Sequence, residues 1–479
     1  LRHSGETEKA LKFIEESLTI DKFNLGCRFE KYFIENNLTE LQEMTSMLNG
    51  SVHNYIEYAF DFASAGMYEE ASQIMHIYME GRTDVYPMAA YMLGYFASRS
   101  GNEEVARQWY QKAQSLSPDK CFPNRIDEIN VLTDAMRMNP ADYKAPYYLG
   151  NFWYAHRRYE EAISCWEKSV EINNQFPTAL RNLSLAYYNK RNKKEEARQL
   201  LEKAFELDKT DSRIFMELDQ LYKKMGRGHA ERLALLEEHL DLVEQRDDLC
   251  IERITLYNLL GDYEKAKDLI SNRKFHPWEG GEGKVTGQYI LCRVELAKKA
   301  IKENRYSEAV ALLKETEFYP HNLGEGKLSN AEENEVDYYK GIAYQKLGND
   351  AESTKYLMKA TQGSTEPQQA FYYNDQQPDK IFYQGLAWRA LGEENKARSR
   401  FNKLIDHGKK HLFDDCKIDY FAVSLPELAI WEDNLNIRNQ IHCYYVMALG
   451  YSGLGKEELA EEYYEKVKRL DVNKQVFRM

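Results

Sequence analysis

Two segments in the latter half of the chain contain residues that could bind an anionic or polyhydroxylated ligand. Residues 275–284 read FHPWEGGEGK and residues 318–327 read FYPHNLGEGK, so that Phe, Pro and Gly-Glu-Gly-Lys recur in register 43 residues apart. Backbone donors of the glycine-rich turns, together with two lysines stacked near each other, would hold such a ligand against a tryptophan. The candidate binding residues of these twin loops are Trp278, Glu282, Lys284, His321, Glu325 and Lys327.

The same two segments could instead be turns that bind nothing. Proline stops a helix, glycine adopts positive φ, and a lysine in such a turn is solvated. A nucleotide-binding phosphate loop is excluded, because Val285 and Leu328 stand where that motif requires Ser or Thr, and no strand is evident before it.

Two later connections alternate aromatic side chains with carboxylates and amides, in residues 371–375 and 414–421. Aromatic rings can cover the apolar face of a sugar or peptide while Asn and Asp bind its hydroxyl or amide groups. The same rings would equally suit packing of the loops. The candidate binding residues here are Tyr373, Asn374, Asp375, Asp419 and Tyr420.

No arrangement of residues typical of catalysis stands out. Asp414 and Asp415 are adjacent, whereas glycoside hydrolysis needs two facing carboxyl groups roughly 5 to 9.5 Å apart around a substrate. His407 and His411 could share a helix face, but without a third ligand they are more typical of a helix end. We therefore expect no catalytic residue, no metal ion and no cofactor in this chain.

A recurring spacing predicts the helices that must position these segments. Eight residues separate an aromatic residue from a small one in five places: Trp153 and Ala162, Tyr257 and Ala266, Tyr344 and Ser353, Trp388 and Ala397, and Tyr451 and Ala460. In a helical hairpin the small residue lets two helices approach, and a large apolar residue four positions later fills the space beside it. One hairpin cannot bury its apolar face alone, so the pattern predicts a stacked solenoid.

Two of these units follow the pattern of a known repeat family closely. Its leucine, glycine, alanine, aromatic, alanine and proline positions are filled by Leu93, Gly94, Ala106, Tyr110, Ala113 and Pro118. The chain resembles a tetratricopeptide repeat (TPR) protein over nearly its whole length. The resemblance implies an all-α fold, an α-α superhelix of about eleven helix pairs at about 34 residues each. The pairs expected at 22–50 and 211–246 depart most from the pattern.

We expect an N-terminal solenoid over residues 1–270 and a C-terminal one over 271–479. Residues 5–21 read as the second helix of a pair, so the chain begins in mid-repeat and sequence upstream of it is missing. Segment 120–142 has helical spacing of apolar residues and predicts an inserted, packed helix. The C-terminal half should carry its longer loops along one edge of the solenoid, at 271–286, 317–333, 362–379 and 408–437.

Composition excludes several classes of partner. The net charge of −13 argues against a nucleic-acid partner, because a protein needs positive charge on its surface to bind the negatively charged phosphate backbone. No stretch reaches the roughly 18 apolar residues that span a bilayer, so we expect no membrane segment. The seven cysteines show no CxxC spacing, which favours a reducing cytoplasm over a disulfide framework.

The run from Phe275 onward resembles the C-terminal TPR region of a bacterial family of unknown function, whose members carry an upstream β-rich domain similar to sugar mutarotases. The residues that carry this resemblance lie at 278–284, 373–375 and 419–426. It implies a carbohydrate-related context, and no catalytic residue can be transferred from it.

Together these features favour a noncatalytic scaffold. Its concave face and C-terminal loop edge would bind a protein partner or the chain's own upstream domain, with a carbohydrate or small anion as a further ligand. The alternative is the helical part of a carbohydrate-processing enzyme whose catalytic β domain lies upstream.

Overall fold

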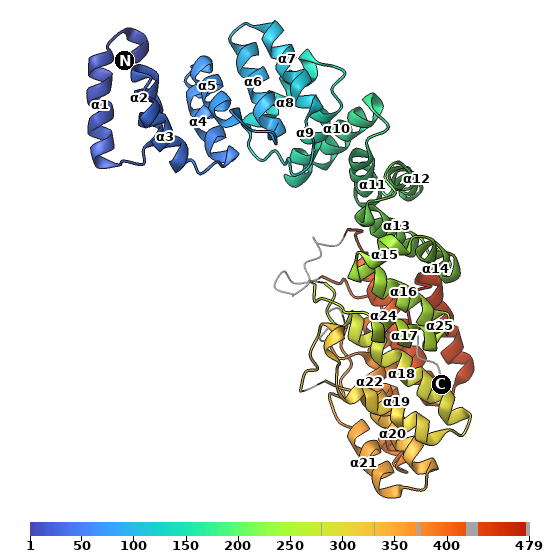
Figure 1. Ribbon diagram of the computed structural model, residues 1–479. Coiled ribbons are helices and arrows are strands. Elements are labelled where there is room, and N and C mark those ends of the chain that lie inside the picture. The colour runs from blue at the N-terminus through green and yellow to red at the C-terminus, as the bar shows by residue number, and fades with distance from the viewer. Residues whose placement is uncertain (279, 330, 371–374, 418–429, 476–479) are drawn as a thin grey trace. The chain divides into compact units, whose positions relative to one another are not determined.

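The computed structural model describes residues 1–278, 280–329, 331–370, 375–417 and 430–475, and in these residues it contains 25 α-helices and no strand (Figure 1). The all-α prediction is confirmed. The chain divides into two compact units, residues 1–207 and 208–479, called unit 1 and unit 2 below. The boundary expected from the sequence lay after residue 270.

The helices of unit 1 are α1 (Thr7–Ile20), α2 (Leu25–Glu35), α3 (Leu38–Met47), α4 (Val52–Ser64), α5 (Tyr68–Met79), α6 (Pro87–Arg99), α7 (Glu103–Ser115), α8 (Asp127–Met138), α9 (Lys144–Ala155), α10 (Tyr159–Ile172), α11 (Pro177–Arg191) and α12 (Lys194–Leu207). A short 3-10 helix, η1 (Arg2–Ser4), precedes them.

The helices of unit 2 are α13 (Ser212–Lys224), α14 (His229–Glu238), α15 (Leu240–Glu244), α16 (Asp247–Leu259), α17 (Tyr263–Asn272), α18 (Lys284–Lys302), α19 (Tyr306–Lys314), α20 (Asn334–Lys346), α21 (Asp350–Ala360), α22 (Pro378–Ala390), α23 (Glu394–His411), α24 (Leu435–Gly453) and α25 (Glu457–Leu470). Two 3-10 helices, η2 (Glu315–Glu317) and η3 (His321–Leu323), lie between α19 and α20.

Most helices pair with their neighbour along the chain, as expected for TPR hairpins. The described helices form eleven pairs: α2/α3, α4/α5, α6/α7, α9/α10, α11/α12, α13/α14, α16/α17, α18/α19, α20/α21, α22/α23 and α24/α25. Helix α1 lies before the first pair, and α8, within segment 120–142, packs beside α6 and α9.

In several pairs, a glycine on the first helix lies in close contact with a large side chain on the second. A Cβ atom at Gly150 would lie 2.4 Å from the Trp166 indole, and one at Gly385 would lie 2.4 Å from the Phe401 ring. The small residue predicted on the second helix, such as Ala162, is fully buried beside this contact. The spacing found in the sequence therefore marks where two helix backbones approach.

The turn inside several pairs uses glycine in the left-handed region. Gly101 has φ 82° between α6 and α7, and Gly261 has φ 83° between α16 and α17. The residue after each glycine caps the next helix: the Asn102 side chain accepts a hydrogen bond from Val105 N, and the Asp262 side chain accepts one from Lys265 N.

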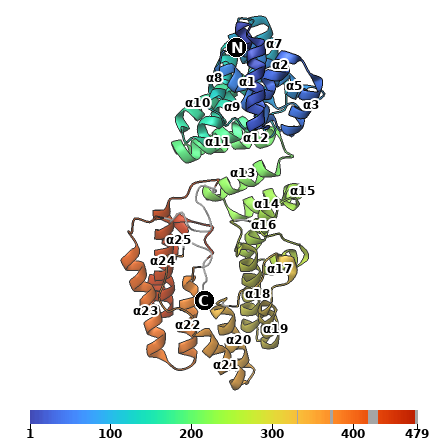
Figure 2. The same ribbon diagram turned by 90° about the vertical axis from the view of Figure 1, so that its left-hand side faces the viewer.

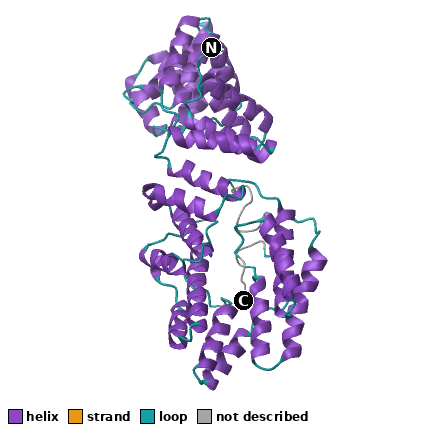
Figure 3. Cartoon of the chain, turned by 90° about the vertical axis from the view of Figure 1, so that its right-hand side faces the viewer, coloured by secondary structure: helices purple, strands orange, loops and turns teal. Residues whose placement is uncertain are grey.

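In unit 2 the helices from α13 to α19 form one row and those from α22 to α25 face it, with α20 and α21 joining the two rows (Figure 2). Residues 471–475, which follow α25, lie between these rows (Figure 3). Long connections follow α17, α19, α21 and α23. Their described residues are 273–278 and 280–283, 315–329 and 331–333, 361–370 and 375–377, and 412–417 and 430–434.

Candidate functional site

The twin loops of unit 2 are joined directly to each other. Phe275 N donates a hydrogen bond of 2.7 Å to Asn322 O, and Asn322 Nδ2 donates to Ile270 O at 2.9 Å and to Arg273 O at 2.8 Å. Gly324, at φ 78°, lies so close that a Cβ atom there would be 2.8 Å from Phe275 O. The repeated Phe-Pro-Gly pattern therefore builds two turns that pack on one another.

Glu325 caps the helix that begins in the neighbouring loop. Its half-buried carboxylate accepts hydrogen bonds from Gly283 N at 3.1 Å and from Thr286 Oγ1 at 3.3 Å, at the start of α18. Burial raises the pKa of Glu325 although these donors favour the charged form. Its carboxylate satisfies two donors at the helix N-terminus.

The two lysines of the twin loops face different surroundings. Lys327 Nζ donates to Thr316 O at 2.8 Å and binds Glu333 Oε2 at 2.6 Å, so that it closes its own loop. Lys284 begins α18 and is exposed. Partial desolvation of its ammonium and then the charge of Lys223 lower its pKa.

The remaining twin-loop candidates are more dispersed. The half-buried Trp278 indole lies over Gly281, where a Cβ atom would be 2.1 Å from its Cε2. Glu282 is half-buried in the same turn, and His321 is exposed at the start of η3. Asp375 is half-buried, and its carbonyl accepts a hydrogen bond from Gln377 Nε2 at 3.1 Å. Tyr373, Asn374, Asp419 and Tyr420 lie outside the described residues.

The long loops of unit 2 also contact one another in chain order. Ser364 N donates to Glu332 Oε1 at 3.3 Å, joining loop 315–333 to loop 361–377. Gln369 Nε2 lies 4.0 Å from Cys416 Sγ, joining loop 361–377 to loop 412–434. The described parts of these loops therefore pack as successive neighbours.

Three histidines gather where α23 ends against α24. The ring centroid of His407 lies 4.6 Å from that of His411 and 5.9 Å from that of His442. His411 Nδ1 lies 2.7 Å from Asp414 Oδ2. Burial lowers the pKa of His407 to about 4 and that of His442 to about 3. No group of three or more His, Cys, Asp or Glu residues suited to a metal ion is present in the residues that the structure describes.

A buried ionic cluster in unit 2 was not foreseen from the sequence. Arg232 on α14 is fully buried; it binds both carboxylate oxygens of Asp219 and also Glu252 Oε1 at 2.7 Å. Lys223 Nζ binds both oxygens of Glu252 at 2.9 Å. Burial would raise the pKa of Glu252, but Lys223 and Arg232 outweigh it and lower the pKa. The only sequence signal was the departure of this pair from the repeat pattern.

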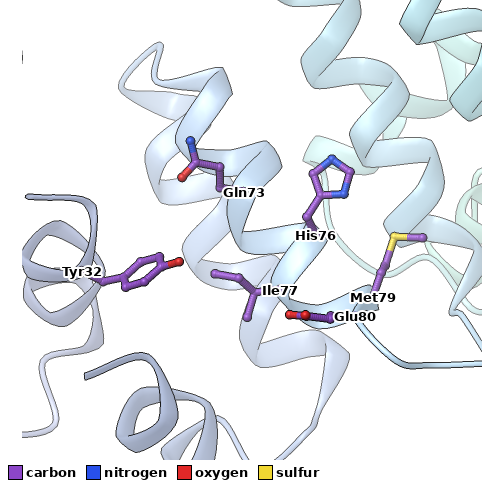
Figure 4. A pocket seen from close by; sticks show the side chains of 6 residues that line it. All are labelled: Tyr32, Gln73, His76, Ile77, Met79 and Glu80. Atoms are coloured by element: carbon purple, nitrogen blue, oxygen red, sulfur yellow. The ribbon is translucent and has the colours of Figure 1, made fainter. Parts of the chain in front are cut away.

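Unit 1 carries two grooves on its surface. One, of about 480 Å³, lies between α2 and α5 and is lined by Tyr32, Gln73, His76, Ile77, Met79 and Glu80 (Figure 4). The other, of about 600 Å³, lies between α10, α11 and α12. We call the second the carboxylate groove; its lining includes the apolar side chains of Val170, Leu183 and Leu200 and the carboxylates of Glu167, Glu171 and Glu196.

The first helices of neighbouring pairs in unit 1 are joined by side-chain amides. Asn151 Oδ1 on α9 accepts hydrogen bonds from Trp166 Nε1 at 3.2 Å and from Asn182 Nδ2 at 3.0 Å. Arg181 Nη1 on α11 lies 3.1 Å from Asn182 Oδ1. These polar side chains are half-buried.

No helix within the described part of the chain is both long enough and apolar enough to cross a membrane.

Tetratricopeptide repeat models match residues 89–120, 178–207 and 441–473. These segments contain most or all of the pairs α6/α7, α11/α12 and α24/α25, so the chain contains tetratricopeptide repeats.

Solved structures with similar folds include PilF from Pseudomonas aeruginosa, at 17% identity over 45% of this chain and 87% of that one, with a TM-score of 0.26. YrrB, described as a TPR protein with an unusual peptide-binding site, is 15% identical over 43% of this chain and 96% of that one, with a TM-score of 0.20. A crystallised TPR domain is 12% identical over 97% of this chain and 98% of its own, with a TM-score of 0.28.

Proposed function

We propose that this chain is a noncatalytic scaffold that binds a protein partner through unit 1. Tetratricopeptide repeats typically mediate protein–protein interaction, and three segments of this chain match them. The observation that carries the proposal is the carboxylate groove. There α10, α11 and α12 meet, and apolar side chains lie beside carboxylates.

The chemistry of the carboxylate groove favours a basic, amphipathic partner segment. Val170, Leu183 and Leu200 supply apolar surface from three different helices. Glu171 and Glu196 are exposed beside it, and Lys203 is the single lysine in the described lining. A helix with apolar residues on one face and lysine or arginine at its edges would fill such a groove and pair with its carboxylates. The net charge of −13 would further attract a basic partner.

Selection of displayed peptides on the intact chain tests this function. Basic amphipathic peptides should be enriched, and their affinity should fall at least about tenfold in the variant Glu171→Lys/Glu196→Lys, because opposed charges become like charges. The matched control is Glu69→Lys/Glu104→Lys, the same charge change at exposed positions of α5 and α7, which should leave binding intact. Equal loss in both variants would mean that binding depends only on net charge.

The surface formed by α9 and α11, the first helices of two neighbouring pairs, is the competing site for the same function. Asn182→Ala removes the amide that links α11 to Asn151 and leaves the carboxylate groove unchanged. If this variant loses peptide binding while the groove variant keeps it, the partner is bound on the row of first helices.

A second ligand class, a small anion such as a sugar phosphate, is favoured by the position of Lys284. Partial desolvation and then Lys223 lower the pKa of Lys284, whereas Glu252, Asp248 and Glu282 raise it. A bound anion would further offset the repulsion between the two lysines, and Trp278 lies in the same loop. Calorimetry with glucose 6-phosphate should detect binding that Lys284→Met abolishes. Absence of heat would leave the chain a protein scaffold without this ligand, and a carbohydrate-related role would then rest on an upstream domain.

A further inference from the structure

The segment after α25 crosses between the two helix rows of unit 2 (Figures 2 and 3). Its successive side chains reach opposite rows. Asn473 and Gln475 contact α13, α14 and α18, whereas Lys474 contacts the row that contains α24. An extended peptide bound in a groove likewise directs its successive side chains to opposite sides, and the contacts on each side determine specificity.

Asn473 is held at two points by the first row. Arg232 Nη1 donates to Asn473 Oδ1 at 3.1 Å, and Asn473 Nδ2 donates to Lys223 O at 3.0 Å. Lys223 lies in the last turn of α13, and its carbonyl also accepts a hydrogen bond from Gly226 N at 3.1 Å. The side-chain amide thus adds a second hydrogen bond to a carbonyl at the end of α13 and binds a fully buried guanidinium.

The next two residues are also recognised specifically. Gln475 Nε2 and Gln288 Nε2 each donate to the oxygen of the other amide at 3.1 Å. Lys474 Nζ lies 5.4 Å from the centroid of the Tyr445 ring. Burial lowers the pKa of Lys474, and the carboxylate of Asp379 on α22 partly offsets that effect. An amide, a cation and a second amide therefore each meet a complementary group.

A second contact closes unit 2 at the same place. Trp431 in loop 412–434 is 2% exposed, and its Nε1 donates to Glu217 O on α13 at 3.1 Å. Asp433 forms an ion pair with Lys224 at the end of α13. Contacts of Trp431 and Asp433 therefore hold α13 in place independently of residues 473–475.

We propose that the space between the two rows of unit 2 is a peptide-binding site that the chain's own residues 471–475 occupy. The segment then acts as an intramolecular inhibitor of this site. Its ligand is a peptide with three consecutive side chains that carry an amide, a positive charge and a second amide. This site is separate from the carboxylate groove of unit 1 and does not depend on it.

Competition in trans tests the proposal on the full-length chain. The probe is a fluorescent peptide of residues 470–479, and binding is measured by anisotropy. Asn473→Ala/Gln475→Ala in the chain removes four side-chain hydrogen bonds of the segment and should let the peptide bind at least about tenfold more tightly than to the unaltered chain. Val472→Ala, at a residue 37% exposed, is the matched control and should behave like the unaltered chain.

A peptide with both alanine substitutions should not bind any of these chains. If the doubly substituted chain keeps its helical circular dichroism and still takes up no peptide, the segment is only a structural strap and the proposal is overturned. A chain that ends at Leu470 is the second test: it should bind the peptide saturably, and binding no tighter than that of the intact chain would also overturn the proposal. Should that chain fail to fold, the double variant decides.

Peptide uptake should be unaffected by Glu171→Lys/Glu196→Lys, which distinguishes this site from the proposed function of unit 1. Loss of uptake in that variant would show that the peptide binds by charge to the carboxylate groove and would overturn the assignment to unit 2.

Discussion

The guanidinium of Arg232 and the carboxylate of Asp219 form a two-point ion pair, at 3.0 and 2.7 Å, in which both side chains are almost entirely buried. The pair joins α13 to α14, which have few other contacts between them, and the same guanidinium reaches Glu252 on α16. It therefore replaces the apolar packing that holds the regular repeats.

Removal of one partner of this pair should destabilise unit 2 strongly. We expect Arg232→Leu to lower the free energy of unfolding by about 3–5 kcal/mol, because Asp219 is left buried without its partner. Urea denaturation followed by circular dichroism measures the change. The double variant Arg232→Leu/Asp219→Leu should regain much of the loss, and a double variant as unstable as the single one would contradict this account. Lys9→Leu, which breaks an exposed pair with Glu6, is the control and should change little.

Glycine-to-alanine substitution should have opposite effects at two helical positions. Gly385→Ala places a methyl group against the Phe401 ring and should cost about 1–3 kcal/mol. Gly287→Ala on α18 meets nothing within 4 Å and should stabilise by about 0.5–1 kcal/mol, since alanine favours helix. Thermal denaturation of both variants checks the signs; equal effects would show that the close approach of α22 and α23 is not required.

Glu325 should act as a cap of α18. Glu325→Ala removes the acceptor of Gly283 N and Thr286 Oγ1, so we expect a loss of about 1–2 kcal/mol and faster hydrogen exchange in the first turn of α18. Glu282→Ala, in the neighbouring turn, serves as the comparison. If hydrogen exchange becomes faster only in Glu282→Ala, the cap of α18 is Glu282 and not Glu325.

Acidification should destabilise unit 2 through its buried histidines. The folded-state pKa values of His407 and His442, about 4 and about 3, lie below the ordinary value of 6.5, so the folded protein binds fewer protons than the unfolded chain. Their contribution to stability is therefore complete above about pH 6.5 and is lost as the pH falls toward 4, by up to about 1.4 kcal/mol per pH unit for each histidine.

Denaturant titrations between pH 7 and pH 4 measure this slope. His442→Gln keeps a donor for Gln368 O but has no proton to gain, so the slope should become shallower. The exposed His321→Gln should leave the slope as it is. An unchanged slope in His442→Gln would mean that other groups cause the acid sensitivity.

The repeating part of the fold follows from short-range sequence patterns. Aromatic and small residues with eight residues between them predict helix pairs, because the contact that holds each pair lies within about 34 residues. The eleven pairs and the four long loops were accessible in this way. The resemblance to a family with an upstream β-rich domain, the carbohydrate-related context and the cytoplasmic location stay predictions.

The site was less accessible from the sequence, because its contacts depend on how the loops fold back. The twin loops read as a pair of lysines facing one ligand, but Lys327 binds carbonyl groups of its own loop and Glu325 caps the neighbouring helix. A sequence motif does not show whether a polar side chain will meet a ligand or the backbone beside it.

The order of residues alone specified the helices, their pairing and the positions of the loops, since these depend on local spacing. It did not specify that Asn473 meets Lys223 O, 250 residues earlier in the chain. That contact arises because the stacked pairs of unit 2 bring α13 beside the segment after α25, and this approach depends on the packing contacts in between. Closure of unit 2 and the occupied space within it are therefore properties of the assembled fold.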